Sequence, residues 1–318
     1  MYSSNFYGTQ SSLINNKVIA KELVQVAWIL MRAAAVYQIF PYSIADKIVR
    51  SFMSAEKHID IILKQIIPVI DGIRSGSIPD DETTYISMLM KLPVLSDGSI
   101  RSATETALRV IRLFSTSNNA RKHANSFILY ELARRPELVQ ELREAIMRLG
   151  PITSESLQQV PLIDSFIREV LRLKNHTFML FRVAKKDIIL STGHVVPEGS
   201  VLTAAIKDAH QDPEMTPMFS DVPLDQFDPY RYMKTMNEEE GEGIWGPTKI
   251  NRPGYYPFGY GMHPCRGRHF AVQEMKFILA EIVTNYNIKI VSKKQVDDRF
   301  LFGVISLPPK ESLIFERI

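Results

Sequence analysis

The chain has 318 residues, 45% of them hydrophobic, and a formal net charge of +3. This near-balance of charge argues against nucleic acid as a partner, and the hydrophobic fraction suffices for a packed core. A single cysteine excludes an intramolecular disulfide and favours a reducing compartment or the cytosolic side of a membrane.

The first half of the chain has the pattern of helices. Hydrophobic residues recur at helical spacing over Lys17–Phe40, Ile44–Phe52 and Ile59–Ile73. The segment Ser102–Arg134 contains neither glycine nor proline, so we expect one long helix there.

The first of these helices is not expected to cross a membrane. Leu23–Phe40 is hydrophobic but contains Gln25, Arg32 and Gln38, which is typical of a buried amphipathic helix. Residues 1–16 lack the basic region and apolar core of a signal peptide. We therefore expect no membrane anchor in this chain.

The second half of the chain mixes helices with short strands. We expect helices over Pro136–Gly150, Leu162–Leu173 and Arg268–Tyr286, and short strands between Asp187 and Ala205 and between Ile288 and Arg317. Because helices and strands do not alternate regularly, we predict a mainly α fold with a small β-sheet, in a single domain over residues 1–318.

The only cysteine, Cys265, lies in a segment suited to present a thiolate. Residues 258–267 read FGYGMHPCRG, and a predicted helix follows Gly267. Peptide N–H groups near a helix N-terminus favour negative charge on the sulfur. Glycines let the backbone pass close to a flat ligand, and cysteine thiolate is one of the few protein ligands of haem iron. The alternative is a buried structural cysteine in a glycine-rich turn.

The pattern F-x-x-G-x-x-x-C-x-G resembles the haem-binding signature of the cytochrome P450 family. Fungal members that oxidise terpenoid or alkaloid skeletons are the most similar. The resemblance implies the P450 fold, haem b as cofactor and Cys265 as the thiolate ligand of its iron, with Phe258 and Gly261 as further signature residues. A zinc or iron–sulfur site is excluded, because one cysteine with one nearby histidine supplies too few ligands.

The resemblance also implies two residues that bind the haem propionates. In the family, a basic residue at the position of Arg182 reaches one propionate, and His263 stands where the family places Arg or His. Met262 replaces an arginine that fungal members usually carry. The alternatives are a surface strand residue for Arg182 and a turn residue for His263.

Three charged residues are similar to the scaffold motifs of the family. Glu169 and Arg172 correspond to the E-x-x-R helix, and Arg231 corresponds to the F-x-P-x-R segment. The resemblance implies a buried triad that fixes the segment leading to Cys265, since Arg–carboxylate pairing is geometrically rigid. Without the resemblance, Glu169 and Arg172 would be interpreted as a solvated pair.

The long helix departs from the family pattern. The family carries an acid and a threonine that deliver protons to bound dioxygen, whereas the corresponding residues here are Asn119 and Ala120. An amide does not exchange a proton at neutral pH, and alanine has no hydroxyl. Ser115, Thr116 and Ser117 are candidates to hold a water instead, unless they bond to carbonyls of their own helix.

The resemblance implies a monooxygenase that acts on an apolar small molecule in fungal secondary metabolism. An NADPH-dependent flavoprotein reductase would supply electrons at the cytosolic face of the endoplasmic reticulum membrane. Arg266, Arg268 and Lys276 are candidates for a basic surface that receives the reductase, or for a solvated face.

Two alternatives remain open within this interpretation. Asn119 and Ala120 favour a haem-thiolate isomerase, dehydratase or peroxide-using enzyme, which needs no reductase. Family members are longer, so we expect the C-terminal two-thirds of the fold, without the N-terminal third that carries the membrane anchor. An anchorless chain would be cytoplasmic. Besides the monooxygenase and the enzymes that need no reductase, the third possibility is a non-catalytic truncated remnant.

Overall fold

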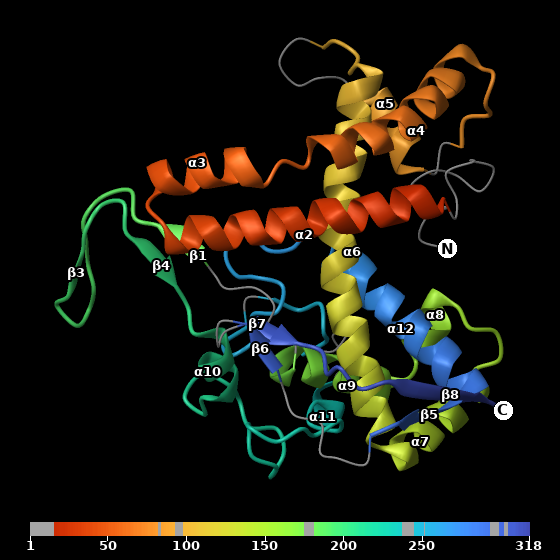
Figure 1. The fold of residues 1–318 in the computed structure, drawn as a ribbon. Coiled ribbons are helices and arrows are strands. Elements are labelled where there is room, and N and C mark those ends of the chain that lie inside the picture. The colour runs from red at the N-terminus through yellow and green to blue at the C-terminus, as the bar shows by residue number, and fades with distance from the viewer. Residues whose placement is uncertain are drawn as a thin grey trace. The chain divides into compact units, whose positions relative to one another are not determined.

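The computed structural model describes residues 16–81, 84–92, 98–174, 181–236, 245–250, 252–292, 299–301 and 305–318. The chain divides into two compact units, Met1–Asn119 and Ala120–Ile318. Their boundary falls within α6 (Ala103–Ala133), the long yellow helix of Figure 1. The single long helix predicted for Ser102–Arg134 is confirmed.

The described part of the first unit is helical. Before α6 it contains α2 (Lys17–Ile39), α3 (Tyr42–Phe52), α4 (Glu56–Ser75) and α5 (Tyr85–Lys91). The hydrophobic stripes predicted from the sequence form its core, which includes Leu23 of α2, Ile62 and Ile66 of α4, and Ile111 of α6. The short α5 was not predicted, because its seven residues are too few to show a helical period.

The second unit contains the C-terminal part of α6 and the remaining helices. These are α7 (Pro136–Met147), α8 (Ser154–Leu157), α9 (Pro161–Leu173), α10 (Ile206–Gln211), α11 (Met233–Met236) and α12 (Arg268–Asn285). α9 begins with a proline, which suits the first helical turn, and is buried along almost its whole length. Its buried residues include charged ones, so α9 is central both to the core and to the site below.

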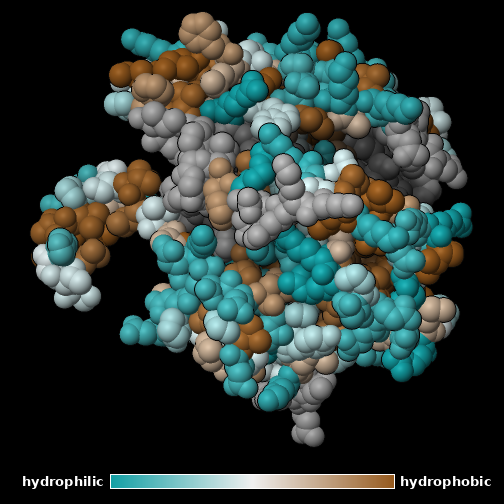
Figure 2. Space-filling view, turned by 60° about the horizontal axis from the view of Figure 1, so that its bottom comes forward, coloured by the Kyte–Doolittle hydropathy of each residue, from teal (hydrophilic) through white to brown (hydrophobic). Residues whose placement is uncertain are grey.

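The described strands pair as four two-stranded antiparallel sheets. β1 (Phe181–Val183) pairs with β4 (Val201–Thr203), β2 (Ile188–Ile189) with β3 (Val195–Val196), β5 (Tyr286–Ile290) with β8 (Leu313–Arg317), and β6 (Arg299–Leu301) with β7 (Ile305–Leu307). Figure 2 shows hydrophobic side chains on the protruding β2–β3 hairpin, where Ile189 and Val195 are exposed. The prediction of a mainly α fold with a little β-structure is confirmed.

Within the segments that the structure describes, no helix is both long and hydrophobic enough to cross a bilayer.

Candidate functional site

Cys265 lies near the end of a loop, residues 254–267, that leads into α12; we call it the cysteine loop. Gly259 and Gly261 turn this loop with φ angles of 81° and 80°, in the left-handed region that favours glycine. The N–H of Cys265 donates to the carbonyl of Phe258 at 2.7 Å, which closes the loop. Cys265 is exposed and lies three residues before Arg268, the first residue of α12. The positive end of the helix dipole is therefore close to the sulfur in sequence.

The other predicted cofactor residues lie in or beside the same loop. Phe258 is half-buried and packs against the core of the second unit, whereas Gly261 and His263 are exposed. Arg182 is part of β1, and its Nη2 donates to the carbonyl of Tyr260 at 3.0 Å. The structure thus brings all five predicted residues to one region. Their roles toward a cofactor stay predictions.

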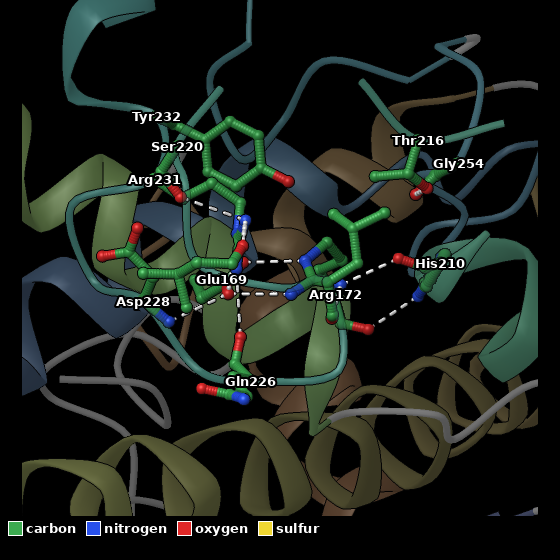
Figure 3. A network of polar contacts seen from close by, with 12 residues as sticks. Glu169, Arg172, His210, Thr216, Ser220, Gln226, Asp228, Arg231, Tyr232 and Gly254 are labelled. Carbon is green, nitrogen blue, oxygen red and sulfur yellow. Dashed lines mark hydrogen bonds and ion pairs between the residues drawn. The ribbon is translucent and has the colours of Figure 1, made fainter. Parts of the chain in front are cut away.

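Glu169 is the centre of a fully buried network that links α9 to the segment before the cysteine loop (Figure 3). Arg172 donates to both carboxylate oxygens of Glu169, from Nε at 2.7 Å and from Nη2 at 2.8 Å. Arg231 Nε and the N–H of Asp228 each donate to Oε1 of Glu169 at 3.1 Å. The predicted triad is confirmed, and the interpretation as a solvated pair is wrong.

Both arginines of this network use their remaining N–H groups on main-chain carbonyls and, for Arg231, also on the hydroxyl of Ser220. Arg172 Nη1 donates to the carbonyls of His210 and Leu224, at 2.8 and 2.7 Å. Arg231 donates through Nη1 and Nη2 to Ser220, Val222, Pro223 and Gln226, at 2.8–3.1 Å. A buried charge persists only when it is paired and hydrogen-bonded in this way. The network therefore fixes residues 220–231, which form neither a helix nor a strand.

Burial and pairing act in opposite directions on Arg172. Burial alone would lower the pKa of its guanidinium, but the hydrogen bonds and the charge of Glu169 outweigh burial and raise that pKa above its ordinary value. Arg172 is therefore a permanent cation, and its role is to hold the scaffold rather than to exchange a proton.

A comparison with known protein families decides what this loop and network belong to. The family model described as Cytochrome P450 matches residues 6–315. The chain belongs to the cytochrome P450 family. Solved P450 structures share its fold: the retinoic acid-bound cyanobacterial CYP120A1 has a TM-score of 0.70 at 18% identity, covering 99% of this chain and 66% of that one.

The chain is also similar to several fungal P450 monooxygenases. Fumitremorgin C monooxygenase of Neosartorya fischeri is 29% identical over 287 residues, which cover 87% of this chain and 55% of that protein. The monooxygenase bsc11 of Alternaria brassicicola is 30% identical, with 79% and 47% covered. The monooxygenase CYP512U6 of Ganoderma lucidum is 35% identical, with 59% and 36% covered. The matched segments thus span between about a third and about half of these relatives.

P450 enzymes carry a haem ligated by cysteine, and the residues present fit such a group. Cys265 offers an exposed soft ligand that could hold haem iron as a thiolate. A Cβ added at Gly261 would meet no atom within 4 Å, so this part of the loop is open. Arg182 and His263 are basic residues suited to the carboxylates of a haem edge.

The departure of α6 from the family pattern stays a prediction. Asn119 and Ala120 lie in its helical stretch, but the side chains of Thr116, Asn118 and Asn119 lie outside the described part of the structure. Ser117 donates to the carbonyl of Phe114 at 3.3 Å, a bond within its own helix. Ser115 is buried, and its hydroxyl has no hydrogen-bond partner among the described residues, so it is the better candidate to hold a water.

The predicted basic surface for a reductase loses one member. Lys276 is only 6% exposed, and its Nζ lies 2.7 Å from a carboxylate oxygen of Asp164, because this face of α12 packs against α9. Its assignment to a surface is wrong. Arg268 donates to the carbonyls of Thr248 and Cys265, both at 3.1 Å, and Arg266 is exposed.

The second unit contains a cavity of about 220 Å³ whose lining includes no residue of the cysteine loop. Hydrophobic Phe127 and Phe300 line it together with the charged Lys207, Asp225 and Arg299. Such mixed walls do not match an apolar substrate pocket. From the sequence, the substrate pocket is expected around Thr177–Leu180 and Phe300–Ile305. The first segment lies outside the described residues, and Phe300 of the second is one of the residues that line this cavity.

Sequence analysis missed two buried residues of this site, Arg168 and His210. The Arg168 guanidinium lies 3.5 Å from the centre of the Tyr255 ring, and its Nη1 donates to the carbonyl of Gly246 at 2.9 Å. His210 bonds to Arg172 and to Tyr256. Neither residue stands in a motif that spacing could reveal, because their partners are 38 to 87 positions away.

Proposed function

We propose that this chain acts as a haem-thiolate monooxygenase that inserts one oxygen atom from dioxygen into an apolar small molecule of fungal secondary metabolism, of terpenoid or alkaloid type. The observation that carries the proposal is Cys265. It is the only cysteine in a P450 chain, and it is exposed in a loop closed by its own N–H. It is therefore the one thiolate that this chain can offer to haem iron.

Each predicted residue has a distinct task in this proposal. When bound, haem b supplies the oxygen chemistry, which no side chain of this chain can perform. Cys265 holds the iron and pushes electron density toward it. Arg182 and His263 bind the propionates, while Phe258 and Gly261 shape the loop. The Glu169 network keeps the segment before the loop in place.

Electrons come in this proposal from an NADPH-dependent flavoprotein reductase at the cytosolic face of the endoplasmic reticulum. Arg266 is an exposed cation next to Cys265, so it is the member of the predicted basic surface that remains suited to an acidic partner.

A second candidate function rests on α6. Asn119 and Ala120 offer neither a carboxyl group nor a hydroxyl where the family has both. Neither side chain can therefore deliver protons to bound dioxygen. An isomerase, a dehydratase or a peroxide-using enzyme needs no such delivery. This candidate predicts product without reductase.

The test is an incubation of the haem-loaded chain with NADPH, a fungal P450 reductase and ¹⁸O₂, beside a Cys265→Ser control. Apolar terpenoids and alkaloids serve as substrates, beginning with fumitremorgin C. We expect a product heavier by one ¹⁸O atom that depends on reductase and on Cys265. Product without reductase, or with peroxide alone, would favour the second candidate. A chain that retains no haem would be the non-catalytic remnant, and the proposal would fail.

A further inference from the structure

His210 is a buried histidine that bonds to the main chain on both sides of its ring. It lies near the end of α10 and is 0% exposed. Its Nδ1 lies 2.7 Å from the carbonyl oxygen of Arg172, and its Nε2 lies 2.8 Å from the backbone nitrogen of Tyr256. A carbonyl only accepts and an amide N–H only donates, so Nδ1 carries the proton and Nε2 accepts. The two bonds together require this single neutral tautomer.

The Nδ1 bond joins His210 to the buried network. Arg172 Nη1 donates to the carbonyl of His210 at 2.8 Å, so the two residues exchange hydrogen bonds, as Figure 3 shows. Arg172 is in turn held by both carboxylate oxygens of Glu169. The imidazole is therefore hydrogen-bonded to a rigid part of the molecule that is fully enclosed by protein.

The Nε2 bond joins His210 to the cysteine loop. Tyr256 precedes Phe258 by two residues, and the carbonyl of Phe258 accepts the N–H of Cys265 at 2.7 Å. The rings of Tyr255 and Tyr256 also stack on the imidazole, with centroids at 6.2 and 5.8 Å and interplanar angles of 23° and 26°. Both a hydrogen bond and ring packing thus fix the first residues of the cysteine loop.

We propose that His210 is a positioning residue that ties the cysteine loop to the Glu169 network and so holds Cys265 in place for its ligand. A buried neutral histidine needs one partner for its donor and one for its acceptor, and in His210 the partner of the Nε2 acceptor is a main-chain N–H of the cysteine loop. This inference rests on the proposed function, because it takes Cys265 as the ligand of haem iron.

Two substitutions separate the two bonds of His210. The side-chain amide of asparagine can reach the position of Nδ1 but not that of Nε2, so His210→Asn keeps the donor to Arg172 and loses the acceptor for Tyr256. The longer His210→Gln reaches the Nε2 position, so it keeps an acceptor for Tyr256 and loses the bond to Arg172. Each variant loses one buried hydrogen bond, so both should be destabilised to a similar degree.

Ser165→Ala is the matched control. Ser165 lies on α9, is 0% exposed, and also makes two buried bonds, donating to the carbonyl of Pro229 at 2.7 Å and accepting from the N–H of Tyr232 at 3.0 Å. Its bonds hold residues 229–232 and not the cysteine loop. If His210 acted on stability alone, amide exchange in the cysteine loop should rise no more in His210→Asn than in Ser165→Ala, which loses two buried bonds instead of one.

The experiment measures three properties of the haem-loaded chain: the urea midpoint of unfolding, amide hydrogen exchange in peptides covering residues 254–265, and the thiolate-type Soret band of the reduced carbon monoxide complex. We expect the urea midpoint to fall by a similar amount in the two His210 variants and at least as much in Ser165→Ala, which loses two buried hydrogen bonds. In His210→Asn alone, exchange in these peptides should rise by about fivefold to tenfold, the equivalent of one lost hydrogen bond. The thiolate-type band should fall at least by about half in His210→Asn and persist in His210→Gln.

Equal effects of His210→Asn and His210→Gln on exchange and spectrum, or no effect of either, would overturn the positioning role. If the unsubstituted chain shows no thiolate-type band, the proposed function fails instead. Hydrogen exchange then still decides whether His210 holds the cysteine loop, because that measurement does not depend on haem.

Discussion

Glu169, Arg172 and Arg231 are fully buried, whereas Cys265, His263 and Gly261 in the same unit are exposed. Around Glu169, the carboxylate and both guanidinium groups meet partners from the chain itself, most of them main-chain carbonyls. The cysteine loop is held through its backbone, while the sulfur of Cys265 and the side chain of His263 are exposed. The charged groups of the Glu169 network therefore hold the fold, whereas the chemical groups of the cysteine loop remain available for a ligand.

The largest expected effect is on the buried side of this comparison. Glu169→Gln leaves the guanidinium groups of Arg172 and Arg231 buried without their counter-charge, so we expect a loss of about 3–5 kcal/mol in the free energy of unfolding. The control is Glu316→Gln, which removes the exposed pair with Lys289 and should cost at most about 1 kcal/mol. Urea denaturation of both variants measures the difference, and similar losses would show that burial of the network contributes nothing.

The next effect concerns the start of the cysteine loop. A Cβ at Gly254 would lie 1.9 Å from Oγ1 of Thr216 and 2.6 Å from its Cα, at a φ of +66°. Gly193 has a φ of +82°, but nothing lies within 4 Å of its Cβ position. We expect Gly193→Ala to cost about 1 kcal/mol for backbone strain, and Gly254→Ala to cost roughly 1–3 kcal/mol more for the collision. Equal shifts of the thermal midpoint would contradict the close approach.

A smaller effect should appear where α12 packs on α9. Lys276→Met leaves Asp164 without the cation that lies 2.7 Å from its carboxylate, in a site where Lys276 is 6% exposed. We expect a loss of about 1–3 kcal/mol in the free energy of unfolding. Lys289→Met, at the exposed pair with Glu316, should change that free energy by less than about 1 kcal/mol. Equal losses of unfolding free energy in Lys276→Met and Lys289→Met would mean that Lys276 belongs to the solvated surface.

The smallest effect depends on pH at the rim of the network. The hydrogen bond from the hydroxyl of Tyr230 to Glu141, at 2.5 Å, raises the pKa of Tyr230 from 10.0 to about 12. The folded chain then binds this proton more tightly than the unfolded chain, so the contribution to stability is complete below pH 10 and is lost as pH rises through about 12. The stability difference between the unsubstituted chain and Tyr230→Phe should therefore shrink over this range. A difference that stays constant from pH 9 to pH 12 would exclude the shift.

Local patterns predicted much of this molecule, because the physical cause lies within a few residues of chain. The period of hydrophobic residues predicted α2, the absence of glycine and proline predicted α6, and the cysteine loop followed from Phe258, the glycines and Cys265. Spacing within one helix likewise placed Glu169 beside Arg172.

Long-range partners could not be predicted in the same way. A lysine on a helix was assigned to the surface, yet Lys276 pairs with Asp164 from 112 positions away. His210 finds its partners 38 and 46 positions away, in a stretch without periodicity. Which polar face meets which partner depends on how the helices pack, and no spacing in the sequence encodes that.

The most direct test of the account is the carbon monoxide difference spectrum of the dithionite-reduced, haem-reconstituted chain beside its Cys265→Ser variant. If Cys265 is the thiolate ligand, the chain shows a strongly red-shifted Soret band and the variant does not. A chain that binds haem without this band, or a variant that retains it, would contradict the assignment of Cys265.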